Sequence, residues 1–572
     1  MSALSALILA AGFAPVSAQE PVAIVPAPAR LEVRAGAFRI DGTTRIAVAD
    51  PGDGEALRLA TWLAEPLRAA SGLPRPIGGG AGPGTILLGL DPAAFGETTP
   101  LPSTGLDPRA ERYRLEVVPD GVRLTAPAHA GLFRGLQTLR QLLPPPFEDG
   151  FRATHGRAWL RDAAPPAAAT PAGADWTVPA VSIEDEPRFP YRGLHLDVGR
   201  HFLPVPFIRE YIDLIAQYRL NVFHWHLTED QGWRIEIRKY PRLTQVGGFR
   251  RETILGRNFD PFIGDGVPHG GFYTQDEIRE IVAYAAARYV TIVPEIEMPG
   301  HSRAALAAYP ELACTPGPFE VSTIWGVHED VFCPSERTFA FLQDVLDEVI
   351  ALFPGPYVHI GGDEVPKTRW RESALAQDVI RRENLADEDA LQSWFVQRIE
   401  RFLSERGRRL IGWDEILEGG IPPRATVMSW RGVQGGIEAA RAGHDVVMTP
   451  TRHLYFDYSQ GAPAREPLAI GGFLPLDTVY AFEPVPPELT AAEAAHVIGA
   501  QGNVWTEYMK SPDHVEYMAL PRMLALAELT WSPPAARSWA GFTARLPAAL
   551  DRLRRLGINY RPPGTETGRR TP

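Results

Sequence analysis

Two adjacent carboxylates, Asp363 and Glu364, follow Gly361 and Gly362 at the end of a short apolar stretch, residues 356–360. Acids placed at the end of a strand suggest acid/base catalysis. Neighbouring side chains on a regular strand point to opposite faces, so both acids can reach one substrate only where the backbone bends, which the two glycines permit. The alternative is a turn in which Asp363 caps the next helix.

The spacing of these acids also limits which catalytic mechanism they can support. Retaining glycosidases of the simple two-carboxylate type set a nucleophile and an acid about 5 Å apart across one bond, normally from different elements of the fold. Adjacent acids fit that arrangement poorly. We therefore expect Asp363 and Glu364 to act on different groups of the substrate.

Composition and charge limit the class of protein. With 572 residues the chain is too long for one ordinary hydrophobic core, and we expect two domains. It has 57 basic and 69 acidic residues, a formal charge of -12 and no basic run. This balance argues against a nucleic-acid partner and favours a neutral or small ligand. Beyond the N-terminus, no stretch approaches the roughly 20 apolar residues of a membrane span.

The first 18 residues are apolar and end in Val16, Ser17 and Ala18, a small-residue site of the kind that is cleaved after export. They predict a signal peptide and a periplasmic or secreted protein. The positive charge that usually precedes such an apolar core is missing, so an ordinary buried segment is the alternative.

The chain has two cysteines, Cys314 and Cys333. In an exported chain they could form one disulfide that closes a loop. Two buried free thiols are the alternative, and two cysteines cannot by themselves make a structural zinc site.

Residues 19–185 predict a small α+β domain. Strands are expected at 85–90, 113–118 and 122–126, with a hairpin turn at Asp120 and Gly121, and an amphipathic helix at 131–143. A stretch rich in Pro and Ala, residues 144–176, is expected to be a surface insertion or linker.

Residues 186–561 alternate apolar strand-like runs with amphipathic helices, the pattern of βα units around a parallel sheet. Helices are expected at 206–218, 275–288, 336–353 and 388–405. The pattern predicts a (β/α)8 TIM barrel as the catalytic domain, followed by a tail at 562–572. The eight expected strands are 193–198, 221–227, 290–296, 357–360, 409–413, 425–430, 445–448 and 496–504.

Barrel enzymes place their chemistry at the C-terminal ends of the strands. Polar and aromatic side chains do follow the expected strands, and three tryptophans at successive ends could line a box for the apolar face of a sugar. These residues are Asp197, Arg200, Glu229, Asp230, Glu295, Glu297, His301, Asp363, Glu364, Trp413, Asp414, Glu415, Trp430, Tyr455, Asp457, Trp505 and Glu507.

At this point the chain resembles glycoside hydrolase family 20, the β-N-acetylhexosaminidases. The matching segments are 194–202, 223–233, 294–301, 359–364, 411–415 and 504–507. The resemblance implies substrate-assisted hydrolysis, in which the 2-acetamido oxygen of the substrate attacks the anomeric carbon and water later opens an oxazolinium ion with retained configuration. No enzyme carboxylate becomes the nucleophile, in agreement with the poor fit of adjacent acids to the two-carboxylate arrangement.

The resemblance also implies a role for each matching residue. Asp363 would orient the acetamido N–H, and Glu364 would serve as acid and then as base. Tyr455 would bond the acetamido oxygen, and His301 with Glu229 would tune the proton affinity of Glu364, where a neighbouring carboxylate raises a pKa. The remaining residues would bind the sugar: Trp413, Trp430 and Trp505 around the acetamido group and ring, and Arg200, Asp457 and Glu507 on the hydroxyls of a terminal residue, which selects exo action.

Several residues have structural alternatives. Asp197 and Glu297 could pair only with Arg200 or other groups at the barrel mouth. His224 and His226 flank a tryptophan within a strand and are expected to be hydrogen-bonded core residues. No metal-ligand spacing is present and the resembled family needs none, so we expect no metal and no cofactor.

Two positions depart from the family pattern. Glu229 stands where many members have Asp, so its reach to His301 can differ by a methylene. A further box tryptophan, expected between strands seven and eight, looks replaced by Tyr480 or Phe482.

The expected partners are oligosaccharides or glycoconjugates that end in an N-acetylhexosamine, with GlcNAc or GalNAc left open. Two other functions remain at this stage. One is a non-catalytic protein that binds N-acetylhexosamine, and the other is a chitinase-like endo-glycosidase with an open cleft.

Overall fold

The structure is a computed structural model that describes residues 22–97, 106–155, 175–259 and 261–564. The predicted signal peptide, most of the Pro/Ala-rich stretch and most of the tail lie outside the described residues. The first part of that stretch is not the predicted surface insertion: Phe147–His155 form a helix with Phe147 and Phe151 buried in the core.

The N-terminal part is an α+β unit built on a seven-stranded sheet in the order β1-β7-β5-β6-β4-β2-β3. Alternate residues of β5 and β6 are buried, because one face of the sheet is covered by helices α1 and α2 and the other is open. The hairpin predicted at Asp120 and Gly121 joins β5 and β6 with Val118 opposite Gly121. The bounds are β1 Arg30–Arg39, β2 Arg45–Val48, α1 Gly54–Ser71, β3 Ile77–Gly79, β4 Thr85–Leu90, β5 Tyr113–Val118, β6 Gly121–Ala126, α2 His129–Leu142, α3 Phe147–His155 and β7 Thr177–Asp185.

The rest of the chain forms a closed eight-stranded parallel barrel surrounded by helices, so the predicted fold class is confirmed. The strands in barrel order are β8 Tyr191–Asp197, β9 Val222–His226, β16 Thr291–Glu295, β17 Tyr357–His359, β18 Arg409–Trp413, β19 Thr426–Ser429, β20 Val446–Met448 and β21 Val497–Gly502. The main helices are α4 Val205–Gln217, α6 Gln275–Ala286, α8 Glu336–Leu352, α10 Ala374–Arg382, α11 Glu388–Glu405, α12 Gln434–Arg441, α14 Leu476–Ala481, α16 Pro512–Ala519, α17 Arg522–Trp531 and α18 Trp539–Leu556.

Helix starts follow local sequence signals. Thr274 and Glu277 form a capping box at the start of α6, in which each side chain bonds the backbone N–H of the other. The side chain of Asp387 accepts from Ala390 N at the start of α11.

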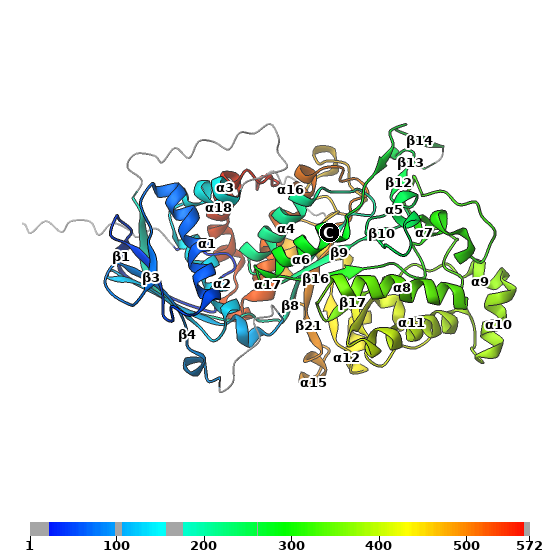
Figure 1. The fold of residues 1–572 in the computed structure, drawn as a ribbon, viewed down its shortest axis with the longest axis horizontal. Coiled ribbons are helices and arrows are strands. Elements are labelled where there is room, and N and C mark those ends of the chain that lie inside the picture. The colour runs from blue at the N-terminus through cyan, green and yellow to red at the C-terminus, as the bar shows by residue number, and fades with distance from the viewer. Residues whose placement is uncertain (1–21, 98–105, 156–174, 260, 565–572) are drawn as a thin grey trace, which may run out of the picture.

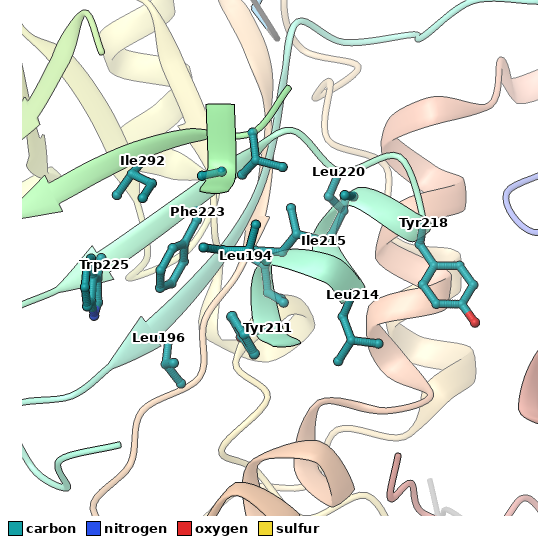
Figure 2. Packing of buried hydrophobic residues seen from close by; sticks show 14 of the residues in the cluster. Leu194, Leu196, Tyr211, Leu214, Ile215, Tyr218, Leu220, Phe223, Trp225 and Ile292 are labelled. Atoms are coloured by element: carbon teal, nitrogen blue, oxygen red, sulfur yellow. The ribbon is translucent and has the colours of Figure 1, made fainter. Parts of the chain in front are cut away.

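The side chains of the barrel strands pack in two cores, one between the strands and the surrounding helices and one inside the barrel. Leu194 on β8 and Phe223 on β9 pack outward against Tyr211 and Ile215 of α4 (Figure 2). Because side chains alternate along a strand, the neighbouring His195 and its counterparts point into the barrel. The interior of the barrel thereby becomes polar toward its C-terminal end.

The C-terminal helix α18 returns to the N-terminal unit and lies beside α3, so the last helix of the described chain connects the two units (Figure 1). Buried ion pairs reinforce this junction: Glu111 of the N-terminal unit accepts from Arg134 of the same unit and from Arg192 of β8. Among the described residues, none of the helices has the length and apolar character required to span a membrane.

Candidate active site

The loop that carries Asp363 and Glu364 leaves β17 through a bend with positive φ angles, which glycine adopts most readily. Gly361 and Gly362 have φ of 68° and 90°, and Glu364 itself has φ of 49°. A Cβ on Gly361 would lie 1.8 Å from a carboxylate oxygen of Glu297. The bend predicted from the two glycines is present, and the positive φ of Glu364 is local strain of the kind found at functional sites.

The bend delivers both acids to one pocket at the C-terminal end of the barrel. All eleven residues predicted for the site line this pocket, although they come from the C-terminal ends of all eight strands and the loops that follow them. They are Arg200, Glu229, His301, Asp363, Glu364, Trp413, Trp430, Tyr455, Asp457, Trp505 and Glu507.

His301 lies between two pairs of acids. Its Nδ1 is 2.9 Å from Glu229 and 3.1 Å from Asp230, while its Nε2 is 3.5 Å from Glu364 and 3.7 Å from Asp363. Burial works against charge on the ring, but these carboxylates raise the pKa of His301 well above its usual value. The ring is therefore an imidazolium at neutral pH.

The imidazolium corrects one expectation from the sequence. The hydrogen bond from His301 is the largest influence on Glu364 and lowers the pKa of that carboxyl, although burial and Glu229 act in the opposite direction. The predicted raising effect of Glu229 exists but is outweighed, because the charged ring stands between the two acids.

Asp363 has the opposite environment. Burial and the neighbouring Glu364 raise the pKa of Asp363 to about 7, against the influence of His301. Its side chain is 13% exposed, compared with 40% for Glu364. Its Oδ1 is buried and accepts no hydrogen bond from the described residues, so it is free to accept one from a ligand.

A second polar group lies across the pocket. Arg200 is 3.2 Å from Glu229 and 3.6 Å from Asp197, with its guanidinium 5.1 Å from the ring centre of Trp505. Burial raises the pKa of Asp457, and the nearby carboxyl of Glu507 raises it further.

Asp457 and Glu507 each keep a buried oxygen without a hydrogen-bond partner in the described chain. Such oxygens can accept from hydroxyl groups of a sugar.

The three predicted tryptophans form a box, and hydrogen bonds beneath it fix two of them. Trp413 Nε1 donates to Glu295 at 2.8 Å, and Trp430 Nε1 donates to Glu415 at 2.9 Å. Ring centres lie 5.8 Å apart for Trp413 and Trp505, and 6.1 Å for Trp430 and the stacked ring of Tyr455. Such walls suit the apolar face of a sugar and its substituents.

The prediction that Tyr480 or Phe482 replaces a further tryptophan of the box was wrong. Tyr480 and Phe482 do not line the pocket: Tyr480 lies on α14, donates to Glu528 and stacks on Phe542 of α18. The helix docks on α17 and α18, which turns its aromatic side chains away from the barrel mouth. Tyr458 and Ile470 line the pocket between strands seven and eight instead.

Sequence reasoning also missed Trp325, which lines the pocket from the long loop after β16. This loop is closed by a disulfide between Cys314 and Cys333, the first of the two alternatives for the cysteines. Nothing in the spacing of Trp325 separates it from other loop aromatics, but the position of the two cysteines around it was a usable signal.

The four residues with structural alternatives differ in their contacts. Asp197 pairs with Arg200 and accepts from the backbone of Thr506, whereas Glu297 has no hydrogen-bond partner for its carboxylate among the described residues. His224 and His226 are fully buried, as expected of core residues. The pKa of Glu297 is raised well above its usual value, first by burial and then by Asp363.

Groups of histidine and carboxylate atoms close enough to hold a metal ion lie under the pocket, among them His226 with Glu229 and Glu297. A metal ligand must be a neutral imidazole. Burial works against charge on His226, but Glu295 and Glu229 raise its pKa to about 10, so a metal ion would have to displace a proton from this ring at neutral pH.

A closed barrel that carries paired acids in an aromatic-lined pocket defines a class, the barrel glycoside hydrolases. Residues 189–534 match the family model described as glycosyl hydrolase family 20, catalytic domain, and residues 22–186 match its domain 2. The chain belongs to glycosyl hydrolase family 20.

Known relatives agree with this assignment. The chain is 47% identical over 544 residues to a beta-hexosaminidase of Porphyromonas gingivalis, covering 94% of this chain and 64% of the relative, less than two thirds of its length. The solved GH20 beta-N-acetylhexosaminidase of Streptomyces coelicolor A3(2) has a TM-score of 0.78 at 32% identity and covers 96% of this chain and 99% of that one. The GH20 exo beta-N-acetylglucosaminidase of Vibrio harveyi, solved with N-acetylglucosamine, has a TM-score of 0.77 at 31% identity, covering 95% and 78%.

Proposed function

We propose that the protein is an exo-acting, retaining β-N-acetylhexosaminidase that uses the acetamido group of its substrate as the nucleophile. The observation that carries the proposal is the contrast between adjacent acids: Asp363 is buried with an unpaired oxygen, and Glu364 is the more exposed of the two. One acid can address a buried acetamido group while the other reaches the glycosidic oxygen.

In the first step the acetamido oxygen attacks the anomeric carbon while Glu364 protonates the leaving oxygen. Asp363 accepts the acetamido N–H, which holds the amide in the attacking geometry and stabilises the positive charge that develops on nitrogen. Tyr455, fully buried beside the tryptophan box, can donate to the acetamido oxygen. The product is an oxazolinium ion, and no bond to the protein forms.

The two acids share one proton in this scheme. Before substrate binds, the proton is on Asp363, whose pKa is about 7, and Glu364 is ionised. An acetamido N–H favours the carboxylate form of Asp363, and a glycosidic oxygen favours protonated Glu364. Nε2 of His301 lies within 4 Å of both acids, so its N–H can donate to whichever of the two is ionised.

In the second step Glu364 acts as base. It takes a proton from a water molecule that attacks the anomeric carbon from the side of the departed group, and the oxazolinium opens with retained configuration. Arg200, Asp457 and Glu507 supply donors and acceptors for hydroxyls of a terminal sugar, which supports exo action.

The test compares two aryl glycosides. The N-acetyl-β-glucosaminide of 4-nitrophenol should be hydrolysed, and the β-glucoside, which lacks the internal nucleophile, should react roughly a thousandfold slower. Equal rates, or a sugar trapped covalently on the protein, would contradict the proposal.

Products of a chito-oligosaccharide separate the other functions. Stepwise release of a monosaccharide supports exo action, and internal cleavage to mixed lengths indicates an endo-enzyme. Binding without turnover indicates a sugar-binding protein. Glu364→Gln is the internal control, because it should lose activity on substrates with poor leaving groups far more than on nitrophenyl substrates.

A further inference from the structure

The floor of the pocket rests on one carboxylate. Glu295, the last residue of β16, is fully buried and accepts from Trp413 Nε1 at 2.8 Å and from His226 Nδ1 at 2.5 Å. His359 Nδ1 and His224 Nε2 approach it to 2.8 and 3.1 Å. Glu295 therefore ties the box tryptophan to strands β9 and β17.

A second buried carboxylate holds the acid/base group. Glu229 Oε1 is 2.9 Å from Nδ1 of His301, whose Nε2 faces Glu364. Its Oε2 is 3.2 Å from Arg200 and 3.1 Å from Nε2 of His226. Glu229 fixes the ring that faces Glu364.

His226 is the residue that reaches both carboxylates. Within the described chain it is the one side chain in contact with Glu295 and with Glu229, through opposite nitrogens of the same ring. An ionised carboxylate only accepts hydrogen bonds, so both ring nitrogens must donate, and a ring that donates twice is an imidazolium. The chain of contacts then runs without a gap from Trp413 to Glu364.

The surroundings of His226 favour this charge. Carboxylates face it from three elements: Glu295 and Glu297 from the end of β16, Glu229 from β10 (Thr228–Glu229), and Asp197 from the end of β8. The ring of His195 lies 5.7 Å away and that of Trp505 lies edge-on at 5.0 Å.

His195 and His224 do not carry the charge in its place. Burial lowers the pKa of His195 well below its usual value and that of His224 to about 4, so both rings are neutral.

Resting on the proposed function, we propose that His226 is a positioning residue, an imidazolium bridge that couples the floor of the acetamido box to the acid/base group. Through Glu295 it holds the indole of Trp413, and through Glu229 it holds His301 against Glu364. The buried His226 cation thus fixes the position of Trp413, which binds the amide, relative to Glu364, which transfers the proton.

The kinetic test uses two substitutions on the same strand. His226→Gln has no charge and cannot donate from opposite sides, whereas His224→Gln alters a contact with only one of the two carboxylates, Glu295. Each variant is assayed on the 4-nitrophenyl and methyl N-acetyl-β-glucosaminides, which have a good and a poor leaving group.

We expect His226→Gln to lose about tenfold more kcat/KM on the methyl glycoside than on the nitrophenyl glycoside, since misplacing Glu364 matters most for the poor leaving group. His224→Gln should lose the same factor on both. In a Glu364→Gln background, His226→Gln should no longer cause a larger loss of kcat/KM on the methyl glycoside than on the nitrophenyl glycoside. Equal losses on both substrates for His226→Gln would overturn the proposal.

A second measurement needs no variant. A neutron structure of the unaltered protein near neutral pH should show a deuteron on both nitrogens of His226, and a single deuteron overturns the bridge even if His226→Gln does not fold. If the unaltered protein hydrolyses neither glycoside, the proposed function fails, while the neutron result still decides whether the bridge exists.

Discussion

At the scale of single residues, two chemically similar acids acquire different roles from their neighbours. Asp363 and Glu364 differ by one methylene, yet burial raises the pKa of the first and the His301 imidazolium lowers that of the second. Proton transfer is most effective when a pair of acids holds one proton near the working pH. The pair can meet this condition because the bend at Gly361 and Gly362 sends the two side chains into different surroundings.

The shared proton predicts the alkaline side of the pH profile. The proton is present below about pH 7 and is lost as the pH rises through the pKa of Asp363, so kcat/KM should fall above that pH. In Asp363→Asn the amide cannot hold the proton, and Glu364, with its lowered pKa, must hold it alone. The alkaline limb should therefore move to lower pH by at least about one unit, with activity reduced roughly a hundredfold.

The measurement is kcat/KM on a nitrophenyl substrate by a stopped assay over about pH 4 to 9. Asp457→Asn is the matched control, since it makes the same change to another buried acid of the pocket: it should raise KM and leave the limb in place. If the alkaline limb of the kcat/KM profile stays near pH 7 in Asp363→Asn, the two acids do not share one proton.

The sequence predicted the pocket residues better than their electrostatics. The eleven site residues were selected by the resemblance to the family motifs, and each lies at or after the C-terminal end of a barrel strand, where parallel strands of a barrel end on one side. The lowered pKa of Glu364 was not predictable, because it depends on the 3.5 Å approach of His301 from a different strand. Tyr458 and Ile470 were missed since they lie on irregular backbone, where no periodicity indicates which way a side chain points.

At the scale of elements, the strands of the barrel were predictable, whereas loop paths and four of the seven strands of the N-terminal sheet were not predicted. The strand predicted at 496–504 is observed at Val497–Gly502, with Trp505 just beyond its end. Helix α14 was not anticipated, and this omission led to the wrong placement of Tyr480, whose ring is held by α17 and α18. A loop residue is positioned by tertiary contacts that a single sequence does not encode locally.

The loop that carries Trp325 shows how an irregular segment is fixed. The disulfide between Cys314 and Cys333 closes it, and Ile254 N donates to Thr323 O from the neighbouring hairpin. A cross-link removes conformational freedom from the unfolded chain and restricts a surface loop in the folded one. The disulfide should therefore support both stability and the rim of the pocket.

Replacing both cysteines by serine tests this role. The double variant Cys314→Ser with Cys333→Ser should unfold about 3 kcal/mol more easily, the value typical of a loop of this length. KM should rise severalfold with little change in kcat, because Trp325 lies at the rim and not at the reacting atoms. The two properties are measured by thermal unfolding and by initial rates.

A reductant provides the control for the cysteines. Reduction should move the unaltered protein toward the variant, and the variant should not respond to the same reductant. If KM is unchanged in both cases, the disulfide has no part in shaping the pocket.

At the scale of the whole molecule, the N-terminal unit is joined to the barrel by charges that are completely buried. Glu111, Arg134 and Arg192 have no exposed side-chain surface, and the Glu111 carboxylate accepts from both guanidinium groups. Burial lowers the pKa of Arg192 to about 10, so it remains charged at neutral pH. Removing one member of such a group leaves a buried charge without compensation.

The last prediction follows from that junction. Glu111→Gln keeps the shape of the side chain but leaves two buried guanidinium groups without a carboxylate, and should cost about 3 to 5 kcal/mol of the free energy of unfolding. Both units should still unfold in one urea transition, because buried apolar side chains of both units belong to one continuous cluster. Activity in buffer should be unchanged, since Arg192 lies at the start of β8, at the opposite end of the barrel from the pocket.

Glu184→Gln is the control: it removes a half-exposed partner of Arg114 and should cost no more than about 1 kcal/mol of the free energy of unfolding. Equal costs for the two variants would mean that the junction depends on apolar packing and not on its charges.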